Sequence, residues 1–399
     1  MVGVLQIIKL LSMLLIITLQ LSLLWLVEKL MQVTVLLKPL IINRITLLFP
    51  WTMYSKTHFL VLSTTTREIE NIIRSLKSSN SCGYDEVSSK LLKLCSYFIS
   101  SPLNYVCNRT LFTGVFPDRL KCTTIRPLFK KGKKDDINNY RPISVLTSFS
   151  KIFEKVLQSR LLKHLTDHNI LVNEQHGFRP NLKTDNATYL LTNEILNALN
   201  NKLSIGGIFC DLEKAFDCVN HKILLTKLEF YGITGNHYKL YKSYLMGRYQ
   251  RTMLYNENVN ITSSTWSKVE HGVPQGLVLG SLLFLIFIND LPKFINDKSV
   301  PLLFAYDTSI LVFHPNPWFF YKTINTVFQT LNDLFKHTLL SLNLAKTHFI
   351  KFISKNNNQL EMDIDYYNKP ISAVTYSRFL GLTVNCSLTW TSHIDLLTK

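Results

Sequence analysis

The 399-residue sequence predicts a mixed α+β fold, and three observations support this prediction. Apolar residues recur at helical spacing in several long segments, and short apolar runs bounded by turn residues indicate strands. The two kinds of segment alternate irregularly, with no internal repeat and no low-complexity linker. Because 47% of the residues are apolar and 18% are charged, the chain can form a large buried core, which excludes wholesale disorder.

Helices are predicted along most of the chain beyond residue 60. The first begins at Thr65, where Thr65 and Glu68 have the spacing of a capping box, and its apolar residues continue at helical spacing to Leu76. A turn rich in Ser, Asn and Gly separates it from the next helix. The later helices are expected at about 86–100, 150–165, 184–203, 221–247 (two helices), 277–290 and 318–340.

Strands are predicted between these helices. TIRPLFKKGKKDDINNYRPISV (124–145) has a strand–turn–strand pattern, and GGIFCDL (206–212) is a short apolar run typical of a buried strand. The hairpin PLLFAYDTSILVF (301–313) places Asp307 at its tip. A strand pair is expected at about 249–270, and a last strand at KTHFIKFI (346–353).

The charge of the chain is strongly positive. Lys and Arg number 44 against 27 Asp and Glu, a formal charge of +17, and residues 121–165 hold eleven of these basic residues against three acids. Such an excess indicates a polyanionic partner, either nucleic acid or an anionic membrane surface. The seven cysteines form no CxxC pair or zinc-spaced cluster, which argues against a zinc knuckle and a disulfide framework and favours reduced thiols in an intracellular protein.

The first 55 residues differ in composition from the rest. Residues 10–27 are eighteen residues without a charge. Eighteen residues is about the shortest apolar stretch that can span a membrane as a helix. No small-residue cleavage site follows, so a removable signal peptide fits poorly. Three interpretations stay open for this segment: a membrane anchor, a buried core helix, or translated sequence that was never selected as protein.

Two acids stand at strand ends in this basic chain. Asp211 ends the buried strand, and Asp307 lies at the hairpin tip. Carboxylates in such positions can hold divalent metal ions against phosphates, and Mg²⁺ prefers oxygen ligands. Taken singly, each acid also fits the solvation of a strand end or a helix cap.

Six motifs in order carry a family resemblance. They are KKGKKDDINNYRPIS (130–144), FCDLEKAFD (209–217), HGVPQGLVLGSLLFLIFINDLP (271–292), FAYD (304–307), SLNLAKTHFI (341–350) and FLGLTV (379–384). Together they resemble the reverse transcriptase of non-LTR retrotransposons, the LINE-like and Jockey-like elements, over about residues 62–390. The resemblance implies a right-hand polymerase of fingers and palm that copies a primed RNA template into DNA from dNTPs, with two Mg²⁺ ions in an intact site.

The resemblance also implies a role for each matching residue. Asp211 and the backbone carbonyl of Leu212 are expected to bind metal, together with Asp307, and Lys346 is expected to protonate the pyrophosphate leaving group. Phe216 matches the aromatic gate that excludes a ribose 2′-hydroxyl. The remaining matches are Arg141, Lys130 and Lys131 on the triphosphate, Gln275 and Gly276 against template and nucleotide, and Phe379, Leu380 and Gly381 as the primer grip. Core packing is an equal alternative for Phe379 and Leu380.

The sequence departs from the family pattern at three positions. The family hairpin reads Phe-Ala-Asp-Asp, whereas this chain has Tyr306 in place of the first, metal-binding aspartate. A tyrosine has a pKa near 10 and brings no negative charge at neutral pH. Leu277 replaces the usual serine and Ser281 the usual proline. We therefore expect a degenerate copy with impaired or no activity, truncated early in the thumb, without an endonuclease domain or a Cys/His knuckle.

The expected organisation follows from these matches. It comprises a hydrophobic segment (1–55), a helical extension (62–120), the reverse transcriptase domain (121–386) and the start of the thumb region (387–399). The competing functions are a non-catalytic RNA- or DNA-binding remnant on the same fold and a membrane-tethered or non-functional remnant, with membrane contact only through residues 10–27. The family implies the nucleus or the cytoplasm.

Overall fold

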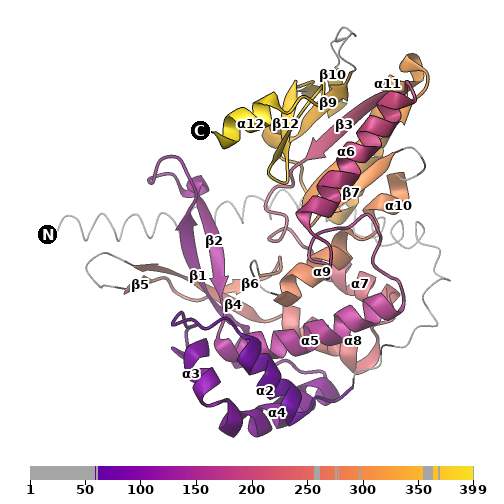
Figure 1. Cartoon of the computed structure of the whole chain (residues 1–399). Coiled ribbons are helices and arrows are strands. Elements are labelled where there is room, and N and C mark those ends of the chain that lie inside the picture. The colour runs from indigo at the N-terminus through magenta and orange to yellow at the C-terminus, as the bar shows by residue number, and fades with distance from the viewer. Residues whose placement is uncertain are drawn as a thin grey trace, which may run out of the picture. The chain divides into compact units, whose positions relative to one another are not determined.

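The computed structural model describes residues 59, 62–255, 261–274, 276, 278–295, 297, 299–353, 363–366 and 369–398. The apolar segment 10–27, for which a membrane anchor is one of three open interpretations, lies outside these residues. No described helix combines the length and the apolar character needed to cross a bilayer. The chain divides into two compact units, Met1–His168 with Asn220–Leu283, and Asn169–Val219 with Phe284–Lys399. Helices and sheets occur in both, which confirms the mixed α+β prediction (Figure 1).

The first unit is mainly helical around one sheet. Its helices are α2 (Thr66–Ser75), α3 (Ser89–Leu94), α4 (Ser96–Thr113), α5 (Ser148–Asp167), α7 (His221–Phe230) and α8 (Gly235–Leu245), with short 3₁₀ turns at Asp118–Lys121 and Ile137–Asn139. The second predicted helix thus becomes two, and α4 continues beyond residue 100 through Pro102 to a cap at Gly114 (φ 70°). Proline costs one helical hydrogen bond, and here the helix continues despite that loss.

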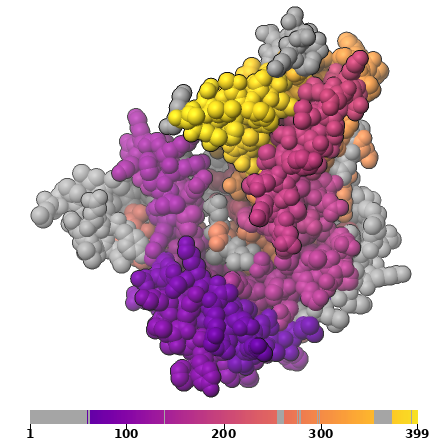
Figure 2. All heavy atoms as spheres, in the orientation of Figure 1, coloured from indigo at the N-terminus to yellow at the C-terminus, as the bar shows by residue number. Residues whose placement is uncertain are grey.

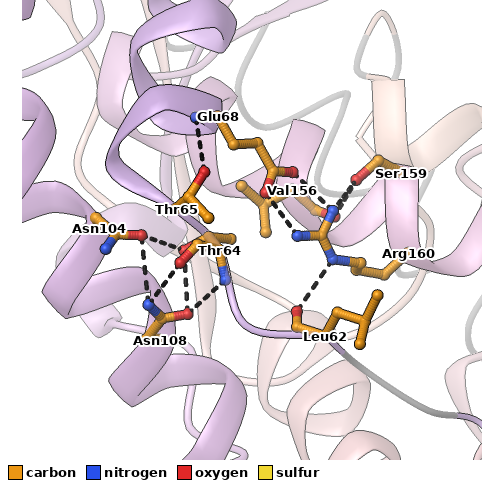
Figure 3. Close-up of polar contacts among 9 residues, drawn as sticks. All are labelled: Leu62, Thr64, Thr65, Glu68, Asn104, Asn108, Val156, Ser159 and Arg160. Atoms are coloured by element: carbon orange, nitrogen blue, oxygen red, sulfur yellow. Dashed lines mark hydrogen bonds and ion pairs between the residues drawn. The ribbon is translucent and has the colours of Figure 1, made fainter.

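The start of α2 departs from the predicted capping box. The Thr65 side chain accepts from the Glu68 N–H at 3.1 Å, as predicted. The Glu68 carboxylate instead binds Arg160 of α5 through two bonds of 2.7 Å (Figure 3). Paired bonds from a guanidinium to a carboxylate are strong and directional, so this contact ties α2 to α5.

A five-stranded sheet completes the first unit. The strands run in the order β2 (Tyr140–Val145), β1 (Cys122–Phe129), β4 (Arg248–Tyr255) and β5 (Ile261–Ser263), and β6 (Ser267–Val269) also pairs with β4. β1 and β2 are antiparallel, so the predicted strand–turn–strand is confirmed. The lysine-rich segment is the turn between them, and Lys131, Lys133 and Lys134 are exposed there.

The second unit is built on a four-stranded antiparallel sheet in the order β7 (Val300–Phe304), β8 (Asp307–His314), β3 (Ser204–Cys210) and β9 (His348–Phe352). Helix α6 (Thr184–Asn200) packs on one face through a buried cluster that includes Leu191, Ile205 and Phe209. Gly206 points to the opposite face, where an added Cβ would meet Phe320 of α11 (Pro317–Thr338). Helices therefore cover both faces of the sheet.

The remaining elements of the second unit were only partly predicted. The apolar helix α9 (Val278–Ile288), which begins in the first unit, is followed by the unpredicted α10 (Leu291–Ile295). The unpredicted C-terminal elements are β10 (Asp363–Tyr366), β11 (Lys369–Ser372), β12 (Tyr376–Phe379), β13 (Leu382–Asn385) and α12 (Thr391–Leu397), and a 3₁₀ turn spans Leu344–Lys346. The C-terminal residues lie against α6 (Figure 2), and Phe379 and Val384 join its buried cluster.

A buried polar cluster of Glu154, Tyr244 and Arg248 links α5, α8 and β4 in the first unit. The Tyr244 hydroxyl donates to Glu154 at 2.7 Å, and the Arg248 guanidinium lies 4.8 Å from the Tyr244 ring centre. Arg248 also donates to the Tyr244 carbonyl at 3.2 Å. Burial raises the pKa of Glu154 to about 7, although Arg248 and the Tyr244 hydrogen bond act in the opposite direction. The folded state therefore holds a proton on Glu154 that the unfolded state releases near pH 4.5.

We predict that this proton makes stability fall as the pH rises. Because the folded pKa is above the unfolded one, the contribution is complete below pH 4.5 and is lost by about pH 7. Thermal or urea unfolding at pH 4.5–7.5 should show the wild type losing roughly 3 kcal/mol of unfolding free energy relative to Glu154→Gln, whose side chain carries no titrating group. A pH-independent difference would contradict the assignment.

Candidate active site

The end of strand β3 carries the first candidate acid. Asp211 follows Cys210, the last residue of β3, and its backbone carbonyl accepts from the Asn343 N–H at 2.8 Å. The next residue, Leu212, is buried and bridges to Leu342. The loop 341–343 thus fixes the backbone of Asp211 and leaves its side chain half-buried at the end of the sheet.

The hairpin of β7 and β8 brings the second acid to the same place. Phe304 pairs with Asp307, so Ala305 and Tyr306 form a two-residue turn. Across the sheet, Thr308 of β8 pairs with Cys210 of β3. Continuing this antiparallel register by one residue sets Asp307 opposite Asp211.

The electrostatics agree with this placement. The pKa of Asp307 rises to about 6, first because the carboxyl is buried and then because of the negative charge of Asp211. A like charge nearby disfavours ionisation of Asp307, and a cation would relieve the repulsion. The two acids therefore form one electrostatic unit at the end of the sheet.

Lys346 supplies a positive charge at this unit. Its Nζ donates to Asp211 Oδ2 at 3.0 Å, and its side chain is 61% exposed. The residue ends the 3₁₀ turn before β9, where the next residue, Thr347, accepts from the Asp211 N–H at 3.5 Å. The Lys346 side chain is thus accessible from solvent while it pairs with Asp211.

Phe216 and Tyr306 belong to an aromatic cluster beside the acids. The buried Phe216 ring lies 4.8 Å from Phe284, 6.0 Å from Tyr306 and 6.4 Å from Phe178, measured between ring centres. The Tyr306 ring therefore packs edge-on against Phe216, and no carboxylate stands at that position of the turn. Among the described residues, no group of three or more His, Cys, Asp and Glu is arranged to hold a metal.

Among the described residues, the carboxylates of Asp211 and Asp307 are oxygen donors at this end of the sheet, and Leu212, whose carbonyl is the third expected ligand, follows Asp211 directly. Mg²⁺ in phosphoryl-transfer sites binds one or two carboxylates and completes its shell with waters and substrate phosphates. This donor set fits one such ion. The two-ion site that the resemblance implies calls for a further carboxylate at position 306, where this chain has a tyrosine, so the residues do not fit a second ion.

The other predicted site residues are described within their own surroundings. Arg141 is exposed on β2 opposite Leu128, and Lys131 is exposed in the β1–β2 turn. The Lys130 N–H donates to the Asn139 carbonyl at 2.8 Å. Gly276 is exposed with φ 87°, a conformation that favours glycine, and Gln275 lies outside the described residues. These residues belong to the first unit and the two acids to the second.

The predicted primer-grip residues lie in the β12–β13 hairpin. Phe379 pairs with Leu382, so Leu380 and Gly381 form the turn, and both have positive φ. The Phe379 ring is buried 6.3 Å from the Phe209 ring and belongs to the α6 cluster. The Phe379 side chain therefore packs in the core, which was the alternative left open for it.

One contributor to the site was missed. The buried Gln175 contacts the hairpin turn at Ala305. A neutral amide in a single sequence gives no signal of such a contact, and the neighbouring Gly177 is the one local hint of a close backbone approach.

Comparisons with known proteins agree with the motif order. Residues 130–384 match the family model described as reverse transcriptase (RNA-dependent DNA polymerase). The probable RNA-directed DNA polymerase from transposon BS of Drosophila melanogaster is 30% identical over 83% of this chain and 37% of its own length. The RNA-directed DNA polymerase from mobile element jockey of the same species is 26% identical over 83% of this chain and 36% of its own length.

This chain spans little more than a third of the length of these relatives. The family match nevertheless covers the β1–β2 turn and β2, the strand-end acids, the hairpin and the β12–β13 turn. The chain therefore belongs to the reverse transcriptase family, in the group encoded by non-LTR retrotransposons.

Proposed function

We propose that this chain is an RNA-directed DNA polymerase domain that extends a primer on an RNA template, with activity strongly reduced by Tyr306. The observation that supports the polymerase site most directly is the register of β3 and β8, with Cys210 opposite Thr308. This register brings the carboxylates of Asp211 and Asp307 to one end of the sheet, where a metal-bound nucleoside triphosphate could bind.

The chain's own residues have distinct tasks in this proposal. Lys346 pairs with Asp211 in the absence of substrate, and it turns to the triphosphate and delivers a proton to the departing pyrophosphate. Arg141 grips the triphosphate with its planar guanidinium, and Lys130 and Lys131 assist it. Phe216 limits the space at the sugar, and Gln275 and Gly276 lie against template and nucleotide. The fingers and palm of the polymerase correspond to the β1–β2 region and to the β7–β8–β3–β9 sheet.

Mg²⁺ held by Asp211, Asp307 and the Leu212 carbonyl would supply positive charge at the 3′-oxygen and at the phosphates. Asp307 enters this role with a pKa near 6, so at neutral pH it is mostly ionised and ready to bind a cation. With Tyr306 at the turn, the site offers two carboxylates where an intact family site offers three. The loss of one member of a catalytic set usually removes most of what the set provides.

A second candidate function is nucleic-acid binding without catalysis. The exposed Lys131, Lys133 and Lys134 of the β1–β2 turn favour it, because affinity for phosphates depends on cationic side chains and not on the acids. The contact of Tyr306 with Phe216 also favours it, since the turn is then stabilised by an aromatic contact that contributes nothing to metal binding.

We predict that Tyr306→Asp raises the rate of primer extension on an RNA template by roughly a hundredfold or more in Mg²⁺ and dNTPs. The physical reason is the return of a carboxylate to the end of the sheet. Tyr306→Phe is the matched control, because it keeps the ring against Phe216 and adds no charge, and it should remain as slow as the wild type. Equal rates for all three proteins would refute the role given to Tyr306.

We predict that Asp211→Asn abolishes the remaining extension and leaves RNA affinity within about twofold, because phosphate contacts supply most of the binding free energy. Extension assays and RNA titrations at two salt concentrations would measure both effects on the same preparations. A loss of RNA affinity as large as the loss of extension would show that Asp211 does not act through metal.

A further inference from the structure

A short segment between α5 and α6 lies along the outer edge of the β7–β8 hairpin. The Leu303 N–H donates to the Glu174 carbonyl at 2.9 Å, and the His176 N–H donates to the Leu303 carbonyl at 2.7 Å. Gln175 thus forms a parallel bridge with Leu303. We refer to residues 174–178 as the strap.

The side chain of Gln175 continues this contact onto the turn. Its Oε1 accepts from the Ala305 N–H at 2.9 Å and from the Gly177 N–H at 2.8 Å, and its Nε2 lies 3.5 Å from the Ala305 carbonyl. The side chain is buried, with 2% exposed. One carboxamide therefore accepts from the N–H groups of two buried residues.

The strap also touches the turn through backbone alone. A Cβ built on Gly177 would lie 2.2 Å from the Ala305 nitrogen and 2.8 Å from the Phe304 carbonyl carbon. Any side chain here would push the turn away, so glycine permits the approach. The strap and the turn are thus in direct backbone contact.

The turn itself needs support. Ala305 is held at φ 58°, a left-handed conformation in which a Cβ is unfavourable, and glycine is the preferred residue at this position of a two-residue hairpin turn. Ala305 is also buried, so water is not a ready replacement for the hydrogen bonds that its backbone makes to the protein. The hydrogen bond from its N–H to Gln175 is a contact that holds it in this conformation.

We infer that Gln175 is a positioning residue: its carboxamide fixes the strained turn at Ala305. The turn then places Asp307 opposite Asp211 and Tyr306 beside Phe216. Gln175 touches neither acid and acts through the turn. The effect on catalysis rests on the proposed function, whereas the effect on the turn does not.

The test uses the full chain and Gln175→Met, which keeps the length of the side chain and removes both hydrogen-bonding groups. Residue-resolved amide exchange should show about tenfold faster exchange at Ala305 and Gly177, the amides bonded to Gln175, because one net hydrogen bond corresponds to about that factor. The amides of Phe209 and Ile208 in β3 should not change. Gln329→Met, on the exposed side of α11, is the matched control and should leave all of these amides unchanged.

The second arm measures primer extension with Tyr306→Asp present throughout. Gln175→Met should lower kcat about tenfold with the KM for dNTP within about twofold, because a small misplacement of a catalytic group lowers the rate. Adding Ala305→Gly to the protein with Tyr306→Asp and Gln175→Met should restore kcat, since glycine adopts the turn without strain. It should not restore protection of the amide at position 305, which still lacks its acceptor.

Each result decides the inference. Unchanged exchange at Ala305 in Gln175→Met overturns it, and so does faster exchange of every amide, which would mean a general loss of stability. A fall in kcat that Ala305→Gly does not rescue overturns the positioning role. If Tyr306→Asp itself is inactive, the proposed function has failed, and local exchange at Ala305 alone supports or overturns the role of Gln175 at the turn.

Discussion

The pairing of β3 with β8 is the constraint on which the candidate site depends. A shift of one residue in this register would turn every side chain of the strand to the other face and separate Asp211 from Asp307. Packing prevents such a shift. Gly206 faces Phe349 and Phe320, where an added Cβ would come within 2.6 Å and 3.1 Å of the rings, while Ile205 and Phe209 enter the cluster under α6. The two faces of β3 are not interchangeable, and this difference fixes where its last residue lies.

Without any added ion, Lys346 balances one of the two carboxylates at this end of the sheet. Asp211 pairs with Lys346 at 3.0 Å. Burial and the negative charge of Asp211 raise the pKa of Asp307 above its usual value, which favours its protonated form. In the same turn, the Tyr306 ring packs against Phe216. In the proposed function, this aromatic contact stabilises the turn but contributes nothing to the binding of a cation.

Much of the fold was predictable because its elements have strong local signals. Thr65 caps α2 as its spacing indicated, and the hairpin lies within one residue of its predicted bounds. Pro102 concealed the length of α4, because a proline normally ends a helix and here tertiary packing outweighs that preference. The strands β10–β13 have four residues each, too few for an alternating apolar pattern to stand out.

For the candidate site, the sequence predicted which acids stand at strand ends but not how the strands bring them together. The sequence places acids after two apolar runs, but the register that joins them and the direction of the Tyr306 ring depend on packing between distant segments. Gln175 gave no signal at all, since its partner Ala305 is 130 residues away. Neutral side chains that bond to backbone become visible only when the backbone is placed.

The most direct test of this account is the titration of the Asp307 carboxyl, followed by carbon NMR, in the wild type and in Asp211→Asn. The pKa of Asp307 should be near 6 in the wild type and lower in the variant, because the repelling charge of Asp211 is removed while burial is unchanged. Equal values in the two proteins would contradict the placement of Asp307 beside Asp211, and with it the candidate site.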